Sequence, residues 1–332
     1  MGYIDMHCDT LMVGLSQKKN TIQKLNNSQI DFSKLKNSPC KAQMFAAFLP
    51  QSEMEEWFGY DYHPDLFDLF HDMRDLLLRS IEEDKEHFAL VETFDDIRAN
   101  EEAGKISCIL TIENGALVNN DMEMLKKLAD LDVKVMALTW NDPNCFGQCN
   151  SEDRELMKLP LTEFGREAIP VMNELGIVVD VSHLNEGGFY GVAECSKKPF
   201  IATHSNAFAL SPSPRNLTDD QIRTLADKGG ISGLNFYGGF LNEDIDNEIS
   251  TVERLCDHAM YMMNKGGEDF IAMGTDFDGG IADLEIPSCD HMEVLFDALQ
   301  QRGMTARQFD KFTHENVERV LKECWVNGGA DD

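Results

Sequence analysis

The stretch Ile-Ser-Cys-Ile-Leu-Thr-Ile-Glu-Asn-Gly, residues 106–115, is a run of apolar and small side chains that ends on the carboxylate of Glu113. Four other short stretches also place, at the end of an apolar run, a side chain that can bind a metal ion or carry a proton. They are Asp-Met-His-Cys-Asp at 5–9, Val-Ser-His at 181–183, Thr-His-Ser at 203–205 and Gly-Thr-Asp-Phe-Asp at 274–278. Because these side chains lie far apart in the sequence, they meet only in a fold that gathers many strand ends on one face. The pattern predicts a dispersed metal site.

Short apolar runs alternate along the chain with longer amphipathic segments. The lengths and the β-branched content of the runs are typical of buried parallel strands. The runs are Tyr3–Asp9, Ala42–Leu49, Ile106–Glu113, Val133–Trp140, Ile177–His183, Phe200–His204, Gly230–Tyr237 and Phe270–Asp276. Helical patterns lie at about 64–84, 121–131, 161–175, 187–196, 218–228, 250–265, 290–302 and 305–324. Thr162 and Thr218 stand where N-caps are expected, and Gly176 stands where a helix should stop.

This alternation of eight strands with helices predicts an α/β fold, the (β/α)8 TIM barrel. A doubly wound open sheet is the structural alternative, but the chain lacks a Gly-rich dinucleotide loop after the first strand. In a barrel, catalytic groups lie at the C-terminal ends of the strands. The residues at these ends are His7, Glu113, Trp140, His183, His204, Tyr237 and Asp276.

The 332 residues are interpreted as one barrel domain, 1–332. A hydrophobic content of 42% is ample for a large core, and no linker, repeat or low-complexity tract interrupts the pattern. The segment 50–63, which carries Trp57 and Tyr60, is predicted to be an insertion near the open end of the barrel.

The charge balance bears on the partners. The chain has 29 Lys and Arg against 59 Asp and Glu, which gives a net charge of −30 spread along its length. Nucleic acid and anionic membranes would be repelled, so neither is expected as a partner. The same acidity is also what a well-solvated surface requires.

A cytoplasmic location is expected from three further features. The N-terminus has neither a basic segment nor a long apolar segment of the kind that directs secretion. No apolar run approaches the roughly 20 residues that cross a bilayer. The nine cysteines are scattered without the density of a disulfide scaffold, which suits a reducing compartment.

The candidate metal ligands are His7, Asp9, Glu113, His183 and His204. His7 and Asp9 stand two residues apart on a strand and therefore project to the same side. Taken alone, such a pair is often incidental, and a histidine at a strand end is often a core residue. Together these side chains form the nitrogen and oxygen set that suits Zn2+ or a similar first-row ion. An unpaired buried carboxylate at Glu113 would be costly, and bridging two cations would remove that cost.

Asp276 is the candidate proton carrier. Asp276 and Asp278 flank Phe277 among glycines that allow a tight turn, so both acids could serve the turn alone. An acid at the end of the eighth strand of a metal-binding barrel is nevertheless well placed to exchange protons with a metal-bound water.

Taken together, these residues resemble the membrane (renal-type) dipeptidase family of zinc peptidases, within the amidohydrolase-like barrels. The motifs that carry the resemblance follow the family's order over almost the whole chain. They are D-x-H-x-D at 5–9, I-E-N-G at 112–115, V-S-H, T-H-S, S-P-R-N at 213–216, N-F-Y at 235–237 and G-x-D-F-D-G at 274–279.

The resemblance implies a site with two Zn2+ ions per chain. His7 and Asp9 would hold one ion, His183 and His204 the other, and Glu113 would bridge them. It also implies that Arg215 receives the substrate carboxylate, that Asp276 handles protons and that Tyr237 lines the substrate pocket.

The chain departs from the family at Leu138-Thr139-Trp140-Asn141. The animal enzymes have, after the Leu-Thr pair, a histidine that contacts the scissile carbonyl. The indole N–H of Trp140 can donate a hydrogen bond in its place, but it cannot accept or relay a proton. Trp140 and Asn141 are therefore candidate substrate-binding residues.

The resulting expectation is a zinc-dependent dipeptidase that hydrolyses small peptides, including dipeptides with a C-terminal D residue, through a hydroxide that bridges two metal ions. Asp276 and Glu113 are its expected catalytic residues. One alternative is another dinuclear-metal amidohydrolase that acts on an N-acyl amino acid, an amide or a lactone. A second, motivated by Trp140, is a metal-binding or regulatory protein without activity. A homodimer is left open.

Overall fold

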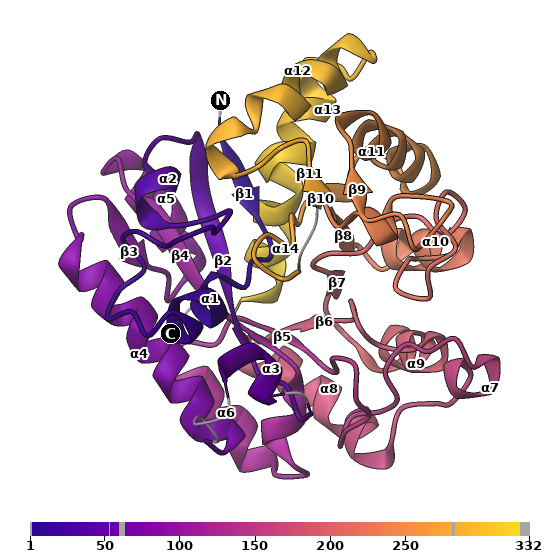
Figure 1. Ribbon diagram of the computed structural model, residues 1–332. Helices are drawn as coiled ribbons and strands as arrows, with labels where there is room; N and C mark the ends of the chain where they lie inside the picture. Colours follow the sequence, from indigo (N-terminus) through magenta and orange to yellow (C-terminus); the bar gives the residue numbers. More distant parts are fainter. Residues whose placement is uncertain (1, 53, 60–63, 281–282, 326–332) are drawn as a thin grey trace, which may run out of the picture.

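Eight parallel strands close into a barrel at the centre of the molecule, and helices surround it (Figure 1). The barrel strands are β1 (Tyr3–Asp5), β2 (Cys40–Phe48), β4 (Ile106–Glu113), β5 (Val135–Ala137), β6 (Val178–Asp180), β7 (Ile201–Ala202), β8 (Ile231–Leu234) and β10 (Ile271–Met273). Pairing of β2 with β4 closes the ring. The computed structural model describes residues 2–52, 54–59, 64–280 and 283–325. The predicted (β/α)8 barrel is confirmed, and the open doubly wound sheet is excluded.

All eight predicted helical patterns are helices in the structure. They correspond to α4 (Leu66–Glu83), α6 (Met122–Asp130), α8 (Glu163–Leu175), α9 (Glu186–Cys195), α10 (Asp219–Asp227), α11 (Val252–Gly266), α12 (Glu293–Gln301) and the C-terminal helical stretch. This last stretch comprises α13 (Ala306–Asp310), a π-helical turn (Lys311–Glu315) and α14 (Asn316–Cys324).

Several shorter elements were not predicted. They are α1 (Thr10–Ser16), α2 (Phe32–Leu35), α3 (Met54–Phe58), α5 (Phe94–Glu102), α7 (Arg154–Met157), the strand β3 (Phe88–Leu90) and the strands β9 (Ile249–Ser250) and β11 (Asp283–Leu284). β3 pairs with the first residues of β4, outside the closed ring, and β9 pairs with β11. Apart from the nine-residue α5, none is longer than seven residues, too short to show a clear hydrophobic period.

Local capping explains where two of the predicted helices, α8 and α10, begin and where α8 ends. The side chains of Thr162 and Thr218 accept hydrogen bonds from the backbone N–H three residues later, at Gly165 and Gln221. Gly176 ends α8 with a φ of 73°, a left-handed conformation that favours glycine. The predicted start and stop signals at Thr162, Thr218 and Gly176 are confirmed.

Successive residues of the barrel strands belong to two different buried clusters. On β4, Ile109 belongs to a cluster that includes Val320 and Leu321 of α14, whereas Leu110 belongs to the cluster between the strands and the surrounding helices. This alternation is the two-residue period of a strand, with one side chain inside the ring and the next outside it. Glu113, four residues after Ile109, therefore points inward at the end of β4.

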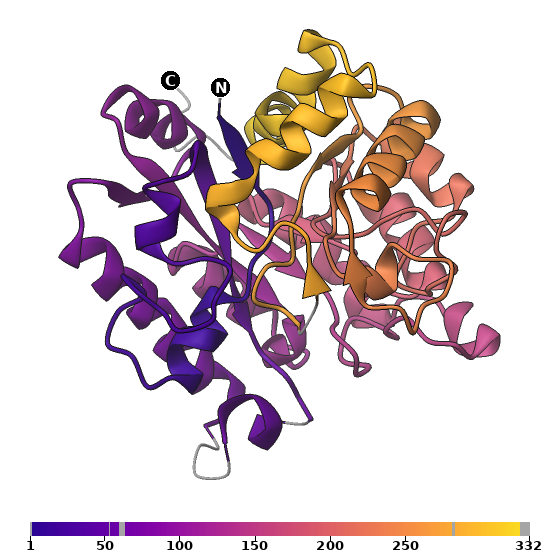
Figure 2. The same cartoon turned by 45° about the horizontal axis from the view of Figure 1, so that its top comes forward.

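The segment with the predicted insertion contains α3, at the end of the molecule opposite the N-terminus (Figure 2). Trp57 lies in α3, whereas Tyr60 falls outside the described residues. The division into one domain with an insertion stays a prediction. Among the described helices, none has both the length and the apolar character needed to cross a membrane.

Candidate metal centre

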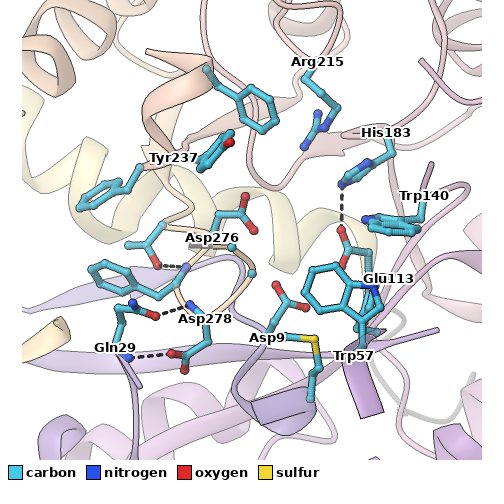
Figure 3. A pocket seen from close by; sticks show the side chains of 18 of the residues that line it. Asp9, Gln29, Trp57, Glu113, Trp140, His183, Arg215, Tyr237, Asp276 and Asp278 are labelled. Atoms are coloured by element: carbon cyan, nitrogen blue, oxygen red, sulfur yellow. Dashed lines mark hydrogen bonds and ion pairs between the residues drawn. The ribbon is translucent and has the colours of Figure 1, made fainter. Parts of the chain in front are cut away.

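Glu113, the last residue of β4, lies between two groups of side chains, of which Figure 3 shows His183 and Asp9. One carboxylate oxygen, Oε1, is 2.8 Å from Nε2 of His183 and 3.6 Å from Nε2 of His204. The other oxygen, Oε2, is 3.7 Å from Nε2 of His7, which itself lies 3.3 Å from Oδ2 of Asp9. A carboxylate whose two oxygens face different ligand groups has the arrangement of a bridging ligand.

The five predicted ligands therefore form two clusters that share Glu113. One cluster contains His7, Asp9 and Glu113, and the other contains Glu113, His183 and His204. A third group, His7, His204 and Asp276, connects the two clusters. In each cluster the potential ligand atoms lie within 4.8 Å of one another, and all five side chains are buried. The structure thus brings together residues from the ends of β1, β4, β6 and β7.

The polar atoms of the cluster fit a bound cation. Nε2 of His7 and Oδ1 of Asp9 are buried, and neither has a hydrogen-bond partner in the part of the chain that the structure describes. Nε2 of His183 lies 3.1 Å from Nε2 of His204. Burial holds the pKa values of both imidazoles well below the usual range, so both rings favour the neutral form that binds metal ions. Buried polar atoms without partners are rare, and a divalent cation would satisfy them.

His7 also shows that the site favours positive charge. Burial by itself lowers the pKa of His7, but the carboxylates of Asp9 and Glu113 outweigh that effect and raise it to about 10. The nitrogen and oxygen donors match those of zinc sites.

Asp276 lies beside this cluster on the loop after β10. Its Oδ1 is 3.7 Å from Nε2 of His7, and its Oδ2 accepts a hydrogen bond of 2.8 Å from Nδ2 of Asn235. Burial raises the pKa of Asp276 to about 6. A carboxyl group with such a pKa can take up and release a proton near neutral pH. Asn235 was not assigned a role from the sequence, although it follows the apolar run of β8 as the other site residues follow theirs.

Asp278, the second acid of the motif, forms hydrogen bonds that connect three segments of the chain. Its carboxylate accepts hydrogen bonds from Oγ1 of Thr10 at 2.7 Å and from the backbone N–H groups of Gln29, at 2.6 Å, and Ile30, at 3.3 Å. Burial raises the pKa of Asp278 to about 6 as well. These bonds fasten α1 and the segment before α2 to the loop after β10.

Arg215 is buried and reaches the same cavity. Its Nη1 donates to the backbone carbonyl of Ser182 and, over 3.1 Å, to Oγ of Ser205, while Nη2 donates to the carbonyl of His204. Its Nε has no partner among the described residues. The guanidinium lies 5.2 Å from the ring centre of Phe240. A fixed cation with donor capacity left over is suited to hold an anionic group.

A cavity of about 580 Å³ opens above the cluster (Figure 3). Trp140 lines it and packs edge-to-face against Phe48 and Trp57, with ring centres 4.8 and 6.2 Å away. Tyr237 also lines it and donates from its hydroxyl to Glu248 over 2.7 Å. Most of its lining is aromatic or acidic.

Asn141 lines the cavity too, and its Oδ1 lies 3.3 Å from Nδ1 of His183. The side chain therefore faces a candidate ligand as well as the substrate space. All the site residues named from the sequence lie in or directly beside this cavity, and the roles assigned to them stay predictions.

A histidine and carboxylate cluster at the C-terminal ends of a (β/α)8 barrel, at the base of an open cavity, is typical of metal-dependent hydrolases. The chain belongs to one family of this class, the membrane dipeptidases of peptidase family M19, whose family model matches residues 1–327. The resemblance found in the sequence is thereby confirmed. Members of the family are hydrolases that act on peptide bonds.

Two curated proteins are similar to this chain over most of its length. An uncharacterized protein in the pqqA 5′ region of Klebsiella pneumoniae is 34% identical over 239 residues, which are 69% of this chain and 86% of that protein. Dipeptidase tcpJ of Claviceps purpurea is 29% identical over 79% of this chain, but the match spans only 61% of the fungal protein.

Two solved structures extend the likeness to three dimensions. One is dipeptidase AC, a metallopeptidase of family M19, with 27% identity and a TM-score of 0.87 over 98% of this chain and 99% of that one. The other is a metallopeptidase from Rhodobacter sphaeroides bound to a phosphinate mimic of the dipeptide L-Ala-D-Ala. It has 26% identity and a TM-score of 0.88, with the same coverage.

Proposed function

We propose that the chain is a zinc-dependent dipeptidase that binds two zinc ions and accepts dipeptides with a C-terminal D residue. The observation that carries the proposal is the position of Glu113, whose two oxygens face different ligand groups beside the guanidinium of Arg215. The dipeptide mimic bound to the Rhodobacter sphaeroides relative supports the substrate class.

His7 and Asp9 would hold one zinc ion, His183 and His204 the other, and Glu113 would bind both. Bound zinc supplies a Lewis acid for the scissile carbonyl and lowers the pKa of water at the site. The cytoplasmic location stays a prediction from the sequence, and the homodimer stays open.

The protein's own groups would perform the remaining steps. Arg215 binds the C-terminal carboxylate of the substrate with its planar fork and thereby fixes the distance to the peptide bond. Asp276 takes a proton from the attacking water and passes it to the departing amine, while Asn235 holds the carboxylate in place through Oδ2. Trp140 and Trp57 cover the reacting bond from solvent, and the indole N–H of Trp140 donates to the substrate.

A substrate panel tests the proposal. It contains L-L and L-D dipeptides, an N-acyl amino acid, a lactone and a tripeptide, each assayed with zinc and with a chelator. We expect zinc-dependent cleavage of the dipeptides alone. Preference for the N-acyl amino acid or the lactone would favour the broader amidohydrolase, and a lack of turnover by the zinc-loaded protein would favour a binding protein.

A further inference from the structure

A buried chain of hydrogen bonds runs from Asp180, the last residue of β6, to the imidazole of His204. Oγ1 of Thr203 donates to Oδ2 of Asp180 over 2.5 Å and lies 2.7 Å from Nδ1 of His204. All three residues are at most 2% exposed. None of them lines the cavity that holds the substrate. The chain therefore approaches His204 from the side opposite Glu113.

The donors around Asp180 determine where the protons lie. Oδ1 accepts from the backbone N–H and the hydroxyl of Ser182 and from the backbone N–H of Thr203. Within the described part of the chain, the only hydrogen bond to Oδ2 comes from the Thr203 hydroxyl. If that hydroxyl turned to His204 instead, a buried carboxylate oxygen would lose its partner, which is costly.

The Thr203 hydroxyl has a single proton, and it donates this proton in the hydrogen bond to Asp180. The other two neighbours of Oγ1 are Oγ of Ser182, at 3.2 Å, and Nδ1 of His204. With its proton directed to Asp180, Oγ1 can only accept from them, so Nδ1 of His204 must carry the imidazole proton. This leaves the lone pair on Nε2, the atom that lies 3.6 Å from Oε1 of Glu113 and 3.1 Å from Nε2 of His183.

We propose that Thr203, held by Asp180, is a positioning residue that fixes the tautomer and the ring orientation of His204 for metal binding. The inference rests on the proposed metal site but assigns a task to two residues outside it. Substitution of a residue that forms a hydrogen bond with a metal ligand commonly lowers the metal affinity 10- to 100-fold.

His183, the other histidine of the pair, is held less firmly by its hydrogen-bond partner. Nδ1 of His183 faces Oδ1 of Asn141 at 3.3 Å, on the wall of the cavity. Water or substrate could replace that partner. His204 is fully buried, so nothing from solvent can replace the Thr203 hydroxyl. The loss of this hydroxyl should therefore lower the affinity of the site for zinc.

Zinc affinity, measured by competition with a chromophoric chelator, tests the proposal. Thr203→Val keeps the shape but removes the hydroxyl, and we expect the affinity for one of two zinc ions to fall about 10- to 100-fold. Thr203→Ser restores the hydroxyl and should recover most of the affinity. Thr313→Val is the matched control, because Oγ1 of this buried threonine donates to the carbonyl of Phe309 in the C-terminal helical stretch. It should lose stability but bind zinc as the wild type does.

An unchanged zinc affinity in Thr203→Val would overturn the positioning role. Equal losses in Thr203→Val and Thr313→Val would overturn it too, because they would point to general destabilisation. Failure of the proposed function looks different, since the wild-type protein would then bind no zinc or would bind it without cleaving dipeptides.

The tautomer itself can be observed without metal. Long-range ¹H–¹⁵N spectra of the metal-free protein, with the His204 signals assigned by comparison with His204→Gln, should show a neutral ring protonated on Nδ1. A ring protonated on Nε2 would contradict the proposal, whatever the zinc affinities.

Discussion

Nη2 of Arg215 donates a hydrogen bond of 3.1 Å to the backbone carbonyl of His204. The residue that we propose as the receptor of the substrate carboxylate therefore also holds the backbone of a proposed zinc ligand. Nη1 makes the equivalent bond to the carbonyl of Ser182, directly before His183. Substrate anchoring and ligand positioning are thus joined in one buried side chain, and experiments on Arg215 must separate them.

The substrate's own carboxylate offers the cleaner test. Converting a good dipeptide to its C-terminal amide leaves the protein untouched but removes the charge that faces Arg215. The loss of one partner of a buried charged pair costs about 2–5 kcal/mol, so kcat/KM should fall roughly 30-fold to several thousand-fold. Steady-state kinetics on the acid and the amide measure this ratio.

Arg215→Lys supplies the matched comparison, with zinc content determined in parallel because of the bonds to His204 and Ser182. Lysine keeps the charge but loses the planar fork. The variant should therefore be impaired strongly on the acid and much less on the amide. Equal turnover of acid and amide by the wild type would remove the basis for this role of Arg215.

The second prediction is the metal content. Five ligands at four strand ends exceed the needs of one tetrahedral zinc, so elemental analysis after zinc reconstitution should approach two ions per chain. His183→Ala or His204→Ala should lower the content by about one. His291→Ala is the control, because this half-exposed histidine pairs with Asp290 away from the cluster. A wild-type protein that stays at one zinc would contradict the bridging role of Glu113.

The third prediction separates the two acids of the D-x-D motif. Asp276→Asn should keep the zinc and the fold but lower kcat by about 10²–10⁴-fold, the usual scale of general acid–base catalysis. Asp278→Asn should reduce kcat less and stability more. This substitution disturbs the hydrogen bonds from Thr10, Gln29 and Ile30. Each buried group left unpaired lowers the free energy of unfolding by about 1–3 kcal/mol. Urea unfolding measures the stability of both variants, and single-turnover kinetics measure their catalytic rates. A larger loss of rate in Asp278→Asn than in Asp276→Asn would mean that Asp278 carries the proton.

The barrel was predictable because its signals are local. Each strand is an apolar run, and caps such as Thr162 and Gly176 mark helix ends within a few residues. The strand β3 could not be found in this way, since it has only three residues, which lie outside the closed ring and pair, within the described residues, with the start of β4 alone.

The site was predictable as far as strand ends determine it. His7, Glu113 and His204 end apolar runs, and a barrel brings such ends together. The bond from Asn235 to Asp276 and the one from Thr203 to Asp180 could not be predicted. Both depend on which of several polar atoms face each other in three dimensions, and no spacing in the sequence encodes that.

The last prediction concerns the stability of the fold at acidic pH and centres on His258 of α11, which is fully buried. Its Nδ1 accepts from the backbone N–H of Ala207 over 3.2 Å, and its Nε2 lies 3.0 Å from the carbonyl of Leu241. Burial lowers the pKa of His258 from 6.5 to about 4 and outweighs the hydrogen bond to the Leu241 carbonyl, which by itself would raise it. The folded protein therefore prefers the neutral ring, which alone can accept the hydrogen bond from Ala207.

The direction of the pH effect follows from this lowered pKa. Above pH 6.5 the ring is neutral in both the folded and the unfolded chain, and its contribution to stability is fully present. As the pH falls from 6.5 towards 4, the unfolded chain gains a proton that the folded chain does not, and stability is lost. A shift of this size corresponds to at most about 3 kcal/mol.

His258→Gln removes the titration while keeping a side-chain donor and acceptor. Urea unfolding of the metal-free wild type and variant at pH 7 and pH 4 gives two free energies of unfolding for each. The raised pKa values of Asp276 and Asp278 act in the opposite sense but cancel in this comparison. The wild type should lose more stability than His258→Gln between the two pH values, and parallel losses would show that His258 does not titrate in this window.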